Sequence, residues 1–350
     1  MFFISLAFLL ILFDGCFYLN FLDHIPRKSK NPMSSLSPLS QAIHDAPRWH
    51  QADSLQNPND IQIQPLAGAA LGAVVTGLDT KKSQTGATIY RLKQALAQHL
   101  VLIFKQQHLD DLQYLAFASY FGSIFRPSSD NPVLGSQADT GTPPDVVPVS
   151  NAVGQGDYTG HAELKPHADH QWTPLPSFAS LLYAIEIPKQ GGQTTWYNTI
   201  KAYDALDETT KAEIDHLQLI TYNPFVRAQN TTATGSYGNS PLYRFHDQPI
   251  VGHGYPHPLV RVHPETGRKA LWLNTHSEVE LLNYDDQAGS ELIARLRAHI
   301  LKPAFRYTHH WEQGDLVFWD NQVTLHSREP FPAEQRRLLK RISLAGSRPF

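Results

Sequence analysis

The sequence predicts a mainly β fold with helical insertions. From Ile61 onward the chain carries short apolar runs bounded by Gly, Pro, Asn and Asp, a pattern typical of strands joined by turns. Three stretches instead carry apolar residues at helical spacing, namely 85–98, 110–121 and 289–300. Strands therefore dominate around the candidate site, whereas helices lie before and between them.

The first part of this region alternates strands and helices. Residues 61–79 contain two apolar runs separated by a turn, which predicts a pair of strands. A helix follows at 85–98, and the uninterrupted apolar run at 99–104 predicts a buried strand. The next predicted helix, 110–121, begins at Asp110, because an aspartate there can accept from the free N–H groups of the first turn.

The rest of the chain is richer in loops. Residues 126–160 hold many Pro, Gly, Ser and Asp residues and lead directly into the candidate site, which favours a lid over that site. Residues 260–274 predict a hairpin around Glu265-Thr-Gly267. The other predicted elements are helices at 199–206 and from 208, a loop-rich stretch at 220–258, and strands within 305–311, 315–320 and 336–346.

The composition excludes several classes of partner and site. A net charge of −3 gives no general attraction to nucleic acid, so no nucleic-acid partner is expected. The single cysteine, Cys16, excludes a disulfide framework within the chain and a thiolate-rich metal site. With 18 histidines, a metal site would use imidazole and carboxylate ligands, which suit a borderline metal such as Fe(II).

The first 32 residues form an apolar leader with two interpretations. Residues 1–22 are almost wholly apolar, and three basic residues follow within 27–30. Either the working protein starts at Met33, or residues 1–22 anchor it in a membrane with the main domain on the cytoplasmic side. Residues 33–60, rich in Ser, Pro, Asn and Asp, are predicted to be a flexible lead-in to a cytoplasmic domain at 61–350.

The candidate site begins at His167-Ala-Asp169. Side chains two residues apart on an extended strand leave the same face, so this imidazole and this carboxylate can bind one metal ion. They are two of the three ligands of a 2-His-1-carboxylate triad, which holds non-haem Fe(II) with open positions. The other His-x-Asp pair, at 108–110, is explained by a helix cap, and the variant His-x-Glu at 161–163 lies just upstream.

The third ligand should come from a distant strand, because such a triad is assembled in space. The candidate is His326, which follows a predicted buried strand at 316–319. Arg337 and Arg341 come later and share one face of a strand. An arginine that faces the interior needs an anionic partner, and a dicarboxylate cosubstrate would supply one through bidentate hydrogen bonds.

Four motifs together make the sequence resemble a known enzyme family. They are HAD at 167–169, PKQGGQTTWYN at 188–198, WDNQVTLH at 319–326 and QRRLLKR at 335–341. From about residue 61 to 348 the chain resembles the taurine/2,4-dichlorophenoxyacetate dioxygenases, which depend on Fe(II) and 2-oxoglutarate. The resemblance implies a double-stranded β-helix (a cupin-like jelly roll) with helical insertions. It also implies a homo-oligomer, since members are often dimers or tetramers.

The resemblance assigns a role to each motif. The implied iron ligands are His167, Asp169 and His326. Thr194 corresponds to a residue that helps to bind 2-oxoglutarate, and Arg337 corresponds to the residue that binds its distal carboxylate. Arg341 corresponds to a second arginine that often faces the anionic group of the substrate.

The resemblance also implies the reaction. Fe(II), 2-oxoglutarate and O2 would hydroxylate a C–H bond of a small molecule, with succinate and CO2 as coproducts. The Arg341 anchor favours sulfonates, sulfate esters or carboxylates, and the presence of the Asp169 carboxylate disfavours halogenation. Two alternatives remain open: a biosynthetic hydroxylase of an amino-acid-derived substrate, and a non-catalytic metal-binding jelly-roll scaffold.

Five further residues lie near these motifs. His170 and Trp172 follow the ligands and are placed to line the pocket, where His170 is expected to contact the substrate; core packing explains Trp172 equally well. Trp319 is expected to be a core aromatic residue near the metal. His309 and His310 are expected to be surface residues rather than a second metal site.

Overall fold

The computed structural model describes residues 60–127, 133, 144–151, 159–223, 254–275, 277 and 279–350. The leader at 1–32 and almost all of the lead-in at 33–60 lie outside these ranges, as do most of the loop at 126–160 and residues 224–253, so those predictions stay predictions. Among the helices that the structure describes, none has both the length and the apolar character needed to cross a membrane.

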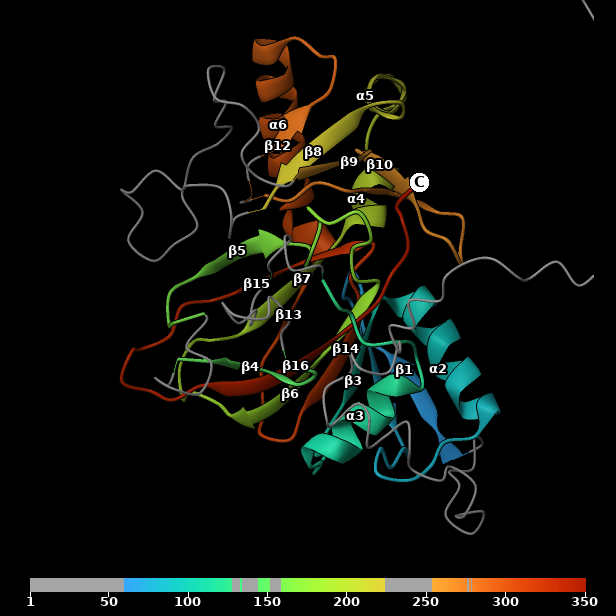
Figure 1. Cartoon of the computed structure of the whole chain (residues 1–350), viewed down its shortest axis with the longest axis vertical. Coiled ribbons are helices and arrows are strands. Elements are labelled where there is room, and N and C mark those ends of the chain that lie inside the picture. The colour runs from blue at the N-terminus through green and yellow to red at the C-terminus, as the bar shows by residue number, and fades with distance from the viewer. Residues whose placement is uncertain are drawn as a thin grey trace, which may run out of the picture. The chain divides into compact units, whose positions relative to one another are not determined.

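Two β-sheets form the centre of the described chain (Figure 1). The larger sheet has the strand order β1 (Gln62–Pro65), β2 (Ala73–Thr76), β3 (Val101–Phe104), β14 (Leu316–Asp320), β6 (Ala179–Glu186), β16 (Leu338–Leu344) and β4 (Val147–Ser150). The smaller sheet has the order β13 (Arg306–His309), β7 (Thr194–Asn198), β15 (Thr324–Arg328) and β5 (Leu164–His167). Among the described strands of these two sheets, β2 and β3 pair in parallel and all the other neighbours pair antiparallel.

The larger sheet is buried on both faces, as the alternate side chains of its central strand show. In β14, Leu316 and Phe318 join one apolar cluster, whereas Val317 and Trp319 join another. Successive side chains on a strand point to opposite faces, so a sheet covered on both sides has strands that are apolar throughout. The cluster that contains Val317 also contains Trp196 from β7, so this face of the larger sheet packs towards the smaller sheet.

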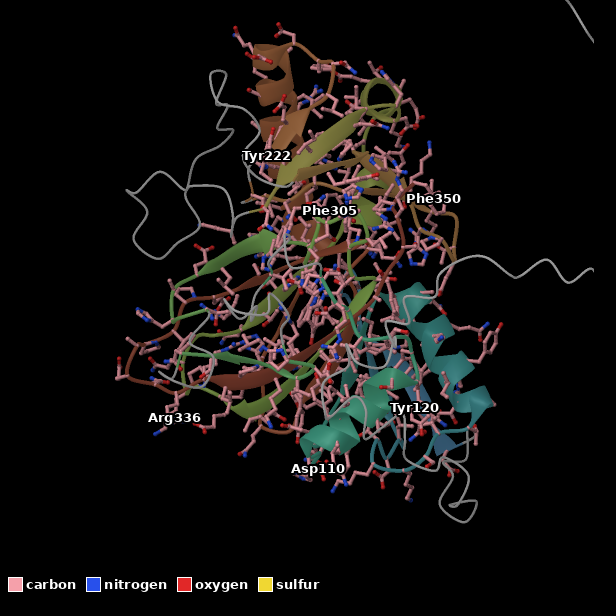
Figure 2. All side chains as sticks on the ribbon, in the orientation of Figure 1. Asp110, Tyr120, Tyr222, Phe305, Arg336 and Phe350 are labelled. Carbon is pink, nitrogen blue, oxygen red and sulfur yellow. The ribbon has the colours of Figure 1, made fainter. Side chains whose placement is uncertain are left out.

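Two helices cover the opposite face of the larger sheet: α2 (Gly86–His99) and α3 (Asp111–Ser119). The Thr85 side chain caps α2 by accepting from an N–H of its first turn. Asp110 and Gln113 form a reciprocal capping box at the start of α3, and Figure 2 shows Asp110 and Tyr120 at the two ends of this helix. The prediction that Asp110 serves as a helix cap is confirmed.

A second group of elements packs on the outer face of the smaller sheet. It comprises α4 (Thr199–Asp204), α5 (Glu208–Ile214), α6 (Asp286–Ile300), β8 (Gln218–Tyr222), β9 (Gly254–Pro258), β10 (Val260–Val262), β11 (Lys269–Leu271), β12 (Val279–Leu281) and a 3-10 turn at Pro303–Phe305. In β15, Leu325 points into this apolar group, which leaves its neighbour His326 on the face towards the larger sheet.

The observed elements confirm the predicted mainly β fold with helical insertions. The hairpin predicted at 260–274 is present as the antiparallel pair β10 and β11. The helix predicted at 289–300 begins earlier, at Asp286, because Asp285 caps it by accepting from the N–H of Ala288. The stretch predicted as loop at 126–160 contains β4, which pairs with β16 and completes one edge of the larger sheet.

Candidate active site

A cavity lies between the two sheets. It encloses about 880 Å³ of empty space, including its open mouth. Both sheets contribute to its walls, which are lined by Val149, Thr159, Leu164, Lys165, His167, Asp169, His170, Trp172, Leu182, Thr194, Trp319, His326, Ser327, Arg328, Arg337 and Arg341. The residues singled out from the sequence therefore meet in one cavity, although they are separated by up to 174 positions (341 − 167).

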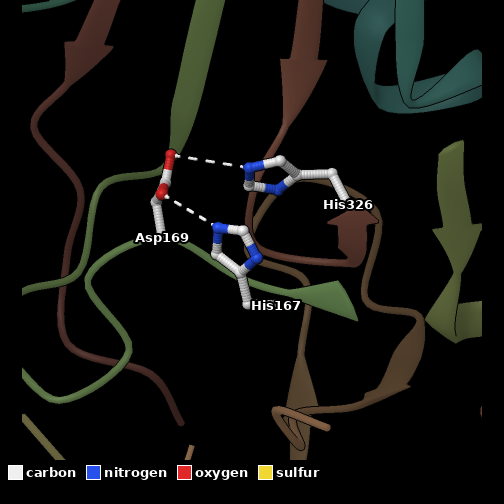
Figure 3. Close-up of side chains that lie close together, drawn as sticks. All are labelled: His167, Asp169 and His326. Carbon is white, nitrogen blue, oxygen red and sulfur yellow. Dashed lines mark ion pairs between the residues drawn. The ribbon is translucent and has the colours of Figure 1, made fainter. Parts of the chain in front are cut away.

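Three side chains in this cavity form a potential metal site (Figure 3). His167 is the last residue of β5, and its cross-strand partner in β15 is His326. The Nε2 atoms of His167 and His326 lie 3.7 and 4.0 Å from the carboxylate oxygens of Asp169, and one ligand atom from each residue falls within 4.8 Å of the others. The two imidazoles and the carboxylate thus converge on one point.

Asp169 is not on the strand that carries His167, which corrects one expectation. β5 ends at His167, and Asp169 lies in the turn that follows. The turn is held by Asn321, whose Oδ1 accepts from the Asp169 N–H at 2.9 Å and whose Nδ2 donates to the Asp169 carbonyl at 2.9 Å. The Asp169 carboxylate is therefore positioned by a turn that the Asn321 side chain stabilises, and not by the alternation of side chains along a strand.

The Asp169 carboxylate is ionised in this environment. Burial alone would raise its pKa, but the positive charge of Arg341 lowers the pKa well below its ordinary value. Nη1 of Arg341 donates to both carboxylate oxygens, at 3.1 and 3.2 Å. Asp169 can therefore bind a metal as an anion.

The two imidazoles are neutral, as metal ligation requires. Burial lowers the pKa of His167, and burial together with the His167 imidazole lowers that of His326 to about 3. The Nδ1 of His167 lies 2.7 Å from the carbonyl oxygen of Lys165. Because a carbonyl can only accept, Nδ1 carries the proton and the Nε2 lone pair faces Asp169. The donor set fits a divalent transition metal.

Arg337 brings an uncompensated positive charge to the same cavity. Its side chain is only 2% exposed, and its pKa is lowered well below the usual value by burial and by the charge of Arg328. Within the described parts of the chain its guanidinium forms no hydrogen bond and no ion pair. A buried cation without an anion is unfavourable, so the cavity is prepared for an anionic ligand at this point.

The glycine pair before Thr194 lets the chain pass close to Arg337. A Cβ atom on Gly192 would lie 3.2 Å from Nε of Arg337, and one on Gly191 would lie 2.2 Å from the carbonyl oxygen of Pro330. Both glycines have positive φ, 71° and 74°, which side chains other than glycine rarely adopt. Thr194 then begins β7 and lines the cavity, and its hydroxyl oxygen lies 2.9 Å from the indole nitrogen of Trp311.

Arg341 and His170, predicted to contact substrate, both line the cavity. Arg341 lies on the same face of β16 as Leu339 and extends to Asp169, so it contacts a potential metal ligand as well as open space. His170 has a positive φ of 62°, stacks on Phe125 at 4.0 Å and pairs with Ser177 through Nδ1 at 2.9 Å. Its ring is thereby fixed in place.

Several pairs considered in the sequence lie elsewhere. His161 is exposed, and Glu163 pairs with Lys165 at 2.6 Å, so neither joins the potential metal site. The expectation that His309 is a surface residue is wrong, because it is buried and bonds to Asp315 at 2.8 Å. His310 is exposed, as expected.

Sequence reasoning missed three residues at the site: Asn321, Arg328 and Trp311. Arg328 lies two residues after His326 on β15 and is buried against the cavity, where it donates to the carbonyl oxygens of Thr159 and Ala162. Its spacing from His326 was a usable signal, since residues two apart share a face. The contacts of Trp311 and Asn321 depend on distant segments and had no comparable signal.

Comparison with known proteins identifies relatives of this chain. The family model described as "Taurine catabolism dioxygenase TauD, TfdA family" matches residues 62–343. An (S)-phenoxypropionate/alpha-ketoglutarate-dioxygenase from Sphingobium herbicidovorans is 31% identical over 81% of this chain and 94% of its own length. Pentalenolactone F synthase from Streptomyces avermitilis is 30% identical, covering 81% of this chain and 93% of that protein.

A solved structure is similar as well. AAD-2, in complex with Mn(II) and N-oxalylglycine, is 28% identical with a TM-score of 0.65, and the match covers 83% of this chain and 98% of that one. The family match spans most of the chain and includes every residue of the potential metal site. The chain therefore belongs to the TauD, TfdA family of 2-oxoglutarate-dependent dioxygenases.

Proposed function

We propose that this protein binds Fe(II) through His167, Asp169 and His326 and uses 2-oxoglutarate and O2 to hydroxylate a C–H bond of a small anionic molecule. One observation carries the proposal. A buried guanidinium without an anionic partner, that of Arg337, lies in the same cavity as a converging His-Asp-His set. The buried guanidinium is suited to bind a carboxylate, and the His-Asp-His set is suited to bind a metal that keeps open coordination positions.

The metal part of the proposal follows from the donor atoms. Two neutral imidazoles and one ionised carboxylate lie close enough together to bind one ion, and they are the ligand set of the 2-His-1-carboxylate triad of non-haem Fe(II) enzymes. The remaining positions would face the cavity. Asn321 and Arg341 orient the carboxylate, so that Asp169 is positioned before a metal arrives.

The 2-oxoglutarate part follows from Arg337 and Thr194. We infer that the keto acid end lies towards the metal site and that the distal carboxylate accepts hydrogen bonds from these two side chains. The AAD-2 structure supports this, because N-oxalylglycine has two carboxylates like 2-oxoglutarate, with an amide nitrogen replacing one methylene.

When bound, the iron would supply the activation of O2 that couples decarboxylation of 2-oxoglutarate to oxidation of the substrate, with succinate and CO2 as coproducts. The protein's own residues hold and orient the reactants. Arg337 and Thr194 fix one end of the cosubstrate, while Trp319, Leu182 and Val149 form apolar walls that exclude water. We also infer that the two sheets are the faces of a double-stranded β-helix.

Arg341 is the proposed anchor for the substrate anion. Only its Nη1 donates to Asp169, and its Nε is buried without a partner among the described residues. A guanidinium has five N–H donors, so Arg341 can hold Asp169 and still bind a second anion. Sulfonates, sulfate esters and carboxylates fit this anchor. A biosynthetic hydroxylation is the second candidate, favoured by the similarity to pentalenolactone F synthase.

The test is an anaerobic titration of the full-length chain. Fe(II) is added, then 2-oxoglutarate, and the weak visible band of the metal–keto acid chelate is recorded. His167→Ala should abolish the band, and Arg337→Ala should require far more 2-oxoglutarate to produce it. Arg336→Ala is the matched control, because that arginine is exposed and paired with Glu186 at 2.7 Å.

Two results would contradict the proposal. A folded, iron-loaded protein that gives no band is not a 2-oxoglutarate-dependent oxygenase, and the scaffold alternative would then take its place. Equal effects of Arg336→Ala and Arg337→Ala would show that general positive charge, rather than the buried guanidinium, attracts the cosubstrate. A positive result is followed by screening small anions for substrate-dependent release of succinate.

A further inference from the structure

The hydroxyl of Thr194 has a fixed hydrogen-bond polarity. The indole Nε1 of Trp311 lies 2.9 Å from its Oγ1. An indole N–H can only donate, so the Thr194 oxygen is the acceptor in this contact. The hydroxyl makes no other hydrogen bond within the described parts of the chain, and its own proton therefore stays available as a donor.

Thr194 lies at the wall of the cavity. Thr194 is 3% exposed and lines the cavity together with Arg337, two residues after the glycine that packs against the Arg337 side chain. A threonine side chain has restricted χ1 freedom because it is branched at Cβ, so the contact with Trp311 settles where the hydroxyl lies. Both the position and the polarity of this donor are thus set before any ligand binds.

Trp311 is itself held by a buried polar group behind the cavity. It lies edge-on to the His309 ring, with centroids 4.8 Å apart and an interplanar angle of 89°. His309 is fixed on both sides, because its Nε2 bonds to Asp315 at 2.8 Å and its Nδ1 lies 3.1 Å from the hydroxyl of Tyr307. None of these supporting residues lines the cavity, so their influence on a ligand passes through Trp311 and Thr194.

We infer that Trp311 is a positioning residue for the cosubstrate: its indole N–H occupies the Thr194 oxygen and directs the Thr194 proton to the distal carboxylate of 2-oxoglutarate. The inference rests on the proposed function and adds a residue that touches neither metal nor cosubstrate. Without the indole N–H, the Thr194 hydroxyl can rotate, and its proton is no longer committed to the carboxylate.

The test compares two ligands on the anaerobic, Fe(II)-loaded, full-length chain. 2-Oxobutyrate shares the keto acid end of 2-oxoglutarate and has no distal carboxylate. Trp311→Phe should weaken the binding of 2-oxoglutarate about fivefold, the effect of one neutral hydrogen bond, and should leave the binding of 2-oxobutyrate unchanged. Replacement of Trp311 by 3-benzothienylalanine removes the N–H and keeps the ring shape, so it should give the same result even if Trp311→Phe folds poorly.

A double-mutant cycle with Thr194→Val tests the pathway. In that background Trp311→Phe should have no further effect on 2-oxoglutarate, because the hydroxyl that it orients is gone. Trp272→Phe is the matched control: Trp272 is 1% exposed, and its indole N–H has no acceptor among the described residues. This variant should bind both ligands as the wild type does.

The outcomes separate this inference from the function on which it rests. Equal weakening of both ligands by Trp311→Phe, or an undiminished effect in the Thr194→Val background, would show that Trp311 acts only through packing and would overturn the inference alone. A wild-type protein that binds 2-oxoglutarate no more tightly than 2-oxobutyrate has no distal carboxylate site. That result would overturn both.

Discussion

Gly192 offers the sharpest test of how the backbone positions Arg337. In Gly192→Ala the new Cβ would lie 3.2 Å from Nε and 3.3 Å from Cδ of Arg337, and 3.0 Å from Cγ of Pro188. The residue also has a φ of +74°, where a non-glycine residue costs about 1–2 kcal/mol. The substitution therefore combines backbone strain with a displacement of the guanidinium by a few tenths of an ångström.

The two effects have separate magnitudes. Backbone strain of about 1–2 kcal/mol should lower Tm by roughly 2–6 °C. Displacement of Arg337 should weaken its charge-assisted hydrogen bonds to the distal carboxylate, and we expect 2-oxoglutarate to bind about tenfold less tightly, a loss of about 1.4 kcal/mol. Thermal unfolding measures the first effect, and anaerobic titration with 2-oxoglutarate measures the second.

Gly267→Ala is the control that isolates the contact from the strain. Gly267 has a φ of +69° in the turn between β10 and β11, and a Cβ there would meet nothing within 4 Å. It should lower Tm by a similar amount and leave 2-oxoglutarate binding unchanged. If Gly192→Ala and Gly267→Ala bind 2-oxoglutarate equally well, the close packing of Gly192 on Arg337 has no role in binding, and the reasoning is refuted.

Three further predictions concern the metal site and the fold. Asn321→Ala should weaken Fe(II) binding by about 10- to 100-fold in a metal titration, because the turn that positions Asp169 loses its two hydrogen bonds to the Asn321 side chain. An unchanged affinity would show that Asn321 is not needed to position Asp169. Removing the metal with a chelator should lower Tm by several degrees, because only the folded site binds the ion. Adding Fe(II) should restore the original Tm of the wild type and should not raise the Tm of His326→Ala. Burial tends to raise the pKa of Asp315, but hydrogen bonds from His309 and Lys105 lower it overall, so its stabilising effect exists above the unfolded pKa of about 4 and fades as pH falls through the lower folded value. Asp315→Asn should therefore be less stable than the wild type in urea at pH 7, with a gap that narrows below about pH 4; a gap independent of pH would contradict this.

Most of the secondary structure was predictable, because its signals are local. Asp110 and Gln113 stand three residues apart and cap one helix, and the uninterrupted apolar run at 316–319 marks β14 as a buried strand. The helix predicted at 289–300 was placed correctly except for its start, where Asp285 caps an additional turn. The edge strand β4 was harder to recognise, because a short strand gains its stability from pairing with β16.

The candidate site, like the secondary structure, was predictable where its signals are local in the sequence. The candidate metal and cosubstrate residues could be proposed from the sequence because residue types at fixed spacings mark them, and the structure brings all of them to one cavity. The manner in which Asp169 is aimed was predicted wrongly, since a strand periodicity cannot reveal where the strand ends. His309 was misplaced for a related reason: its partner Asp315 lies in a turn that only folding brings to it.

By itself, the sequence determined the mainly β fold, the family, and the residue types available for a metal and a dicarboxylate. These properties depend on local periodicity and on motifs a few residues long. Only the tertiary structure decided that Arg337 is buried without an anion, that Arg341 contacts Asp169, and that Trp311 donates to Thr194. Burial and these contacts depend on segments that lie more than a hundred positions apart along the chain. Thr194 and Trp311 meet when β7 pairs with β13, whereas Asp169 and Arg341 meet only when the two sheets pack against each other.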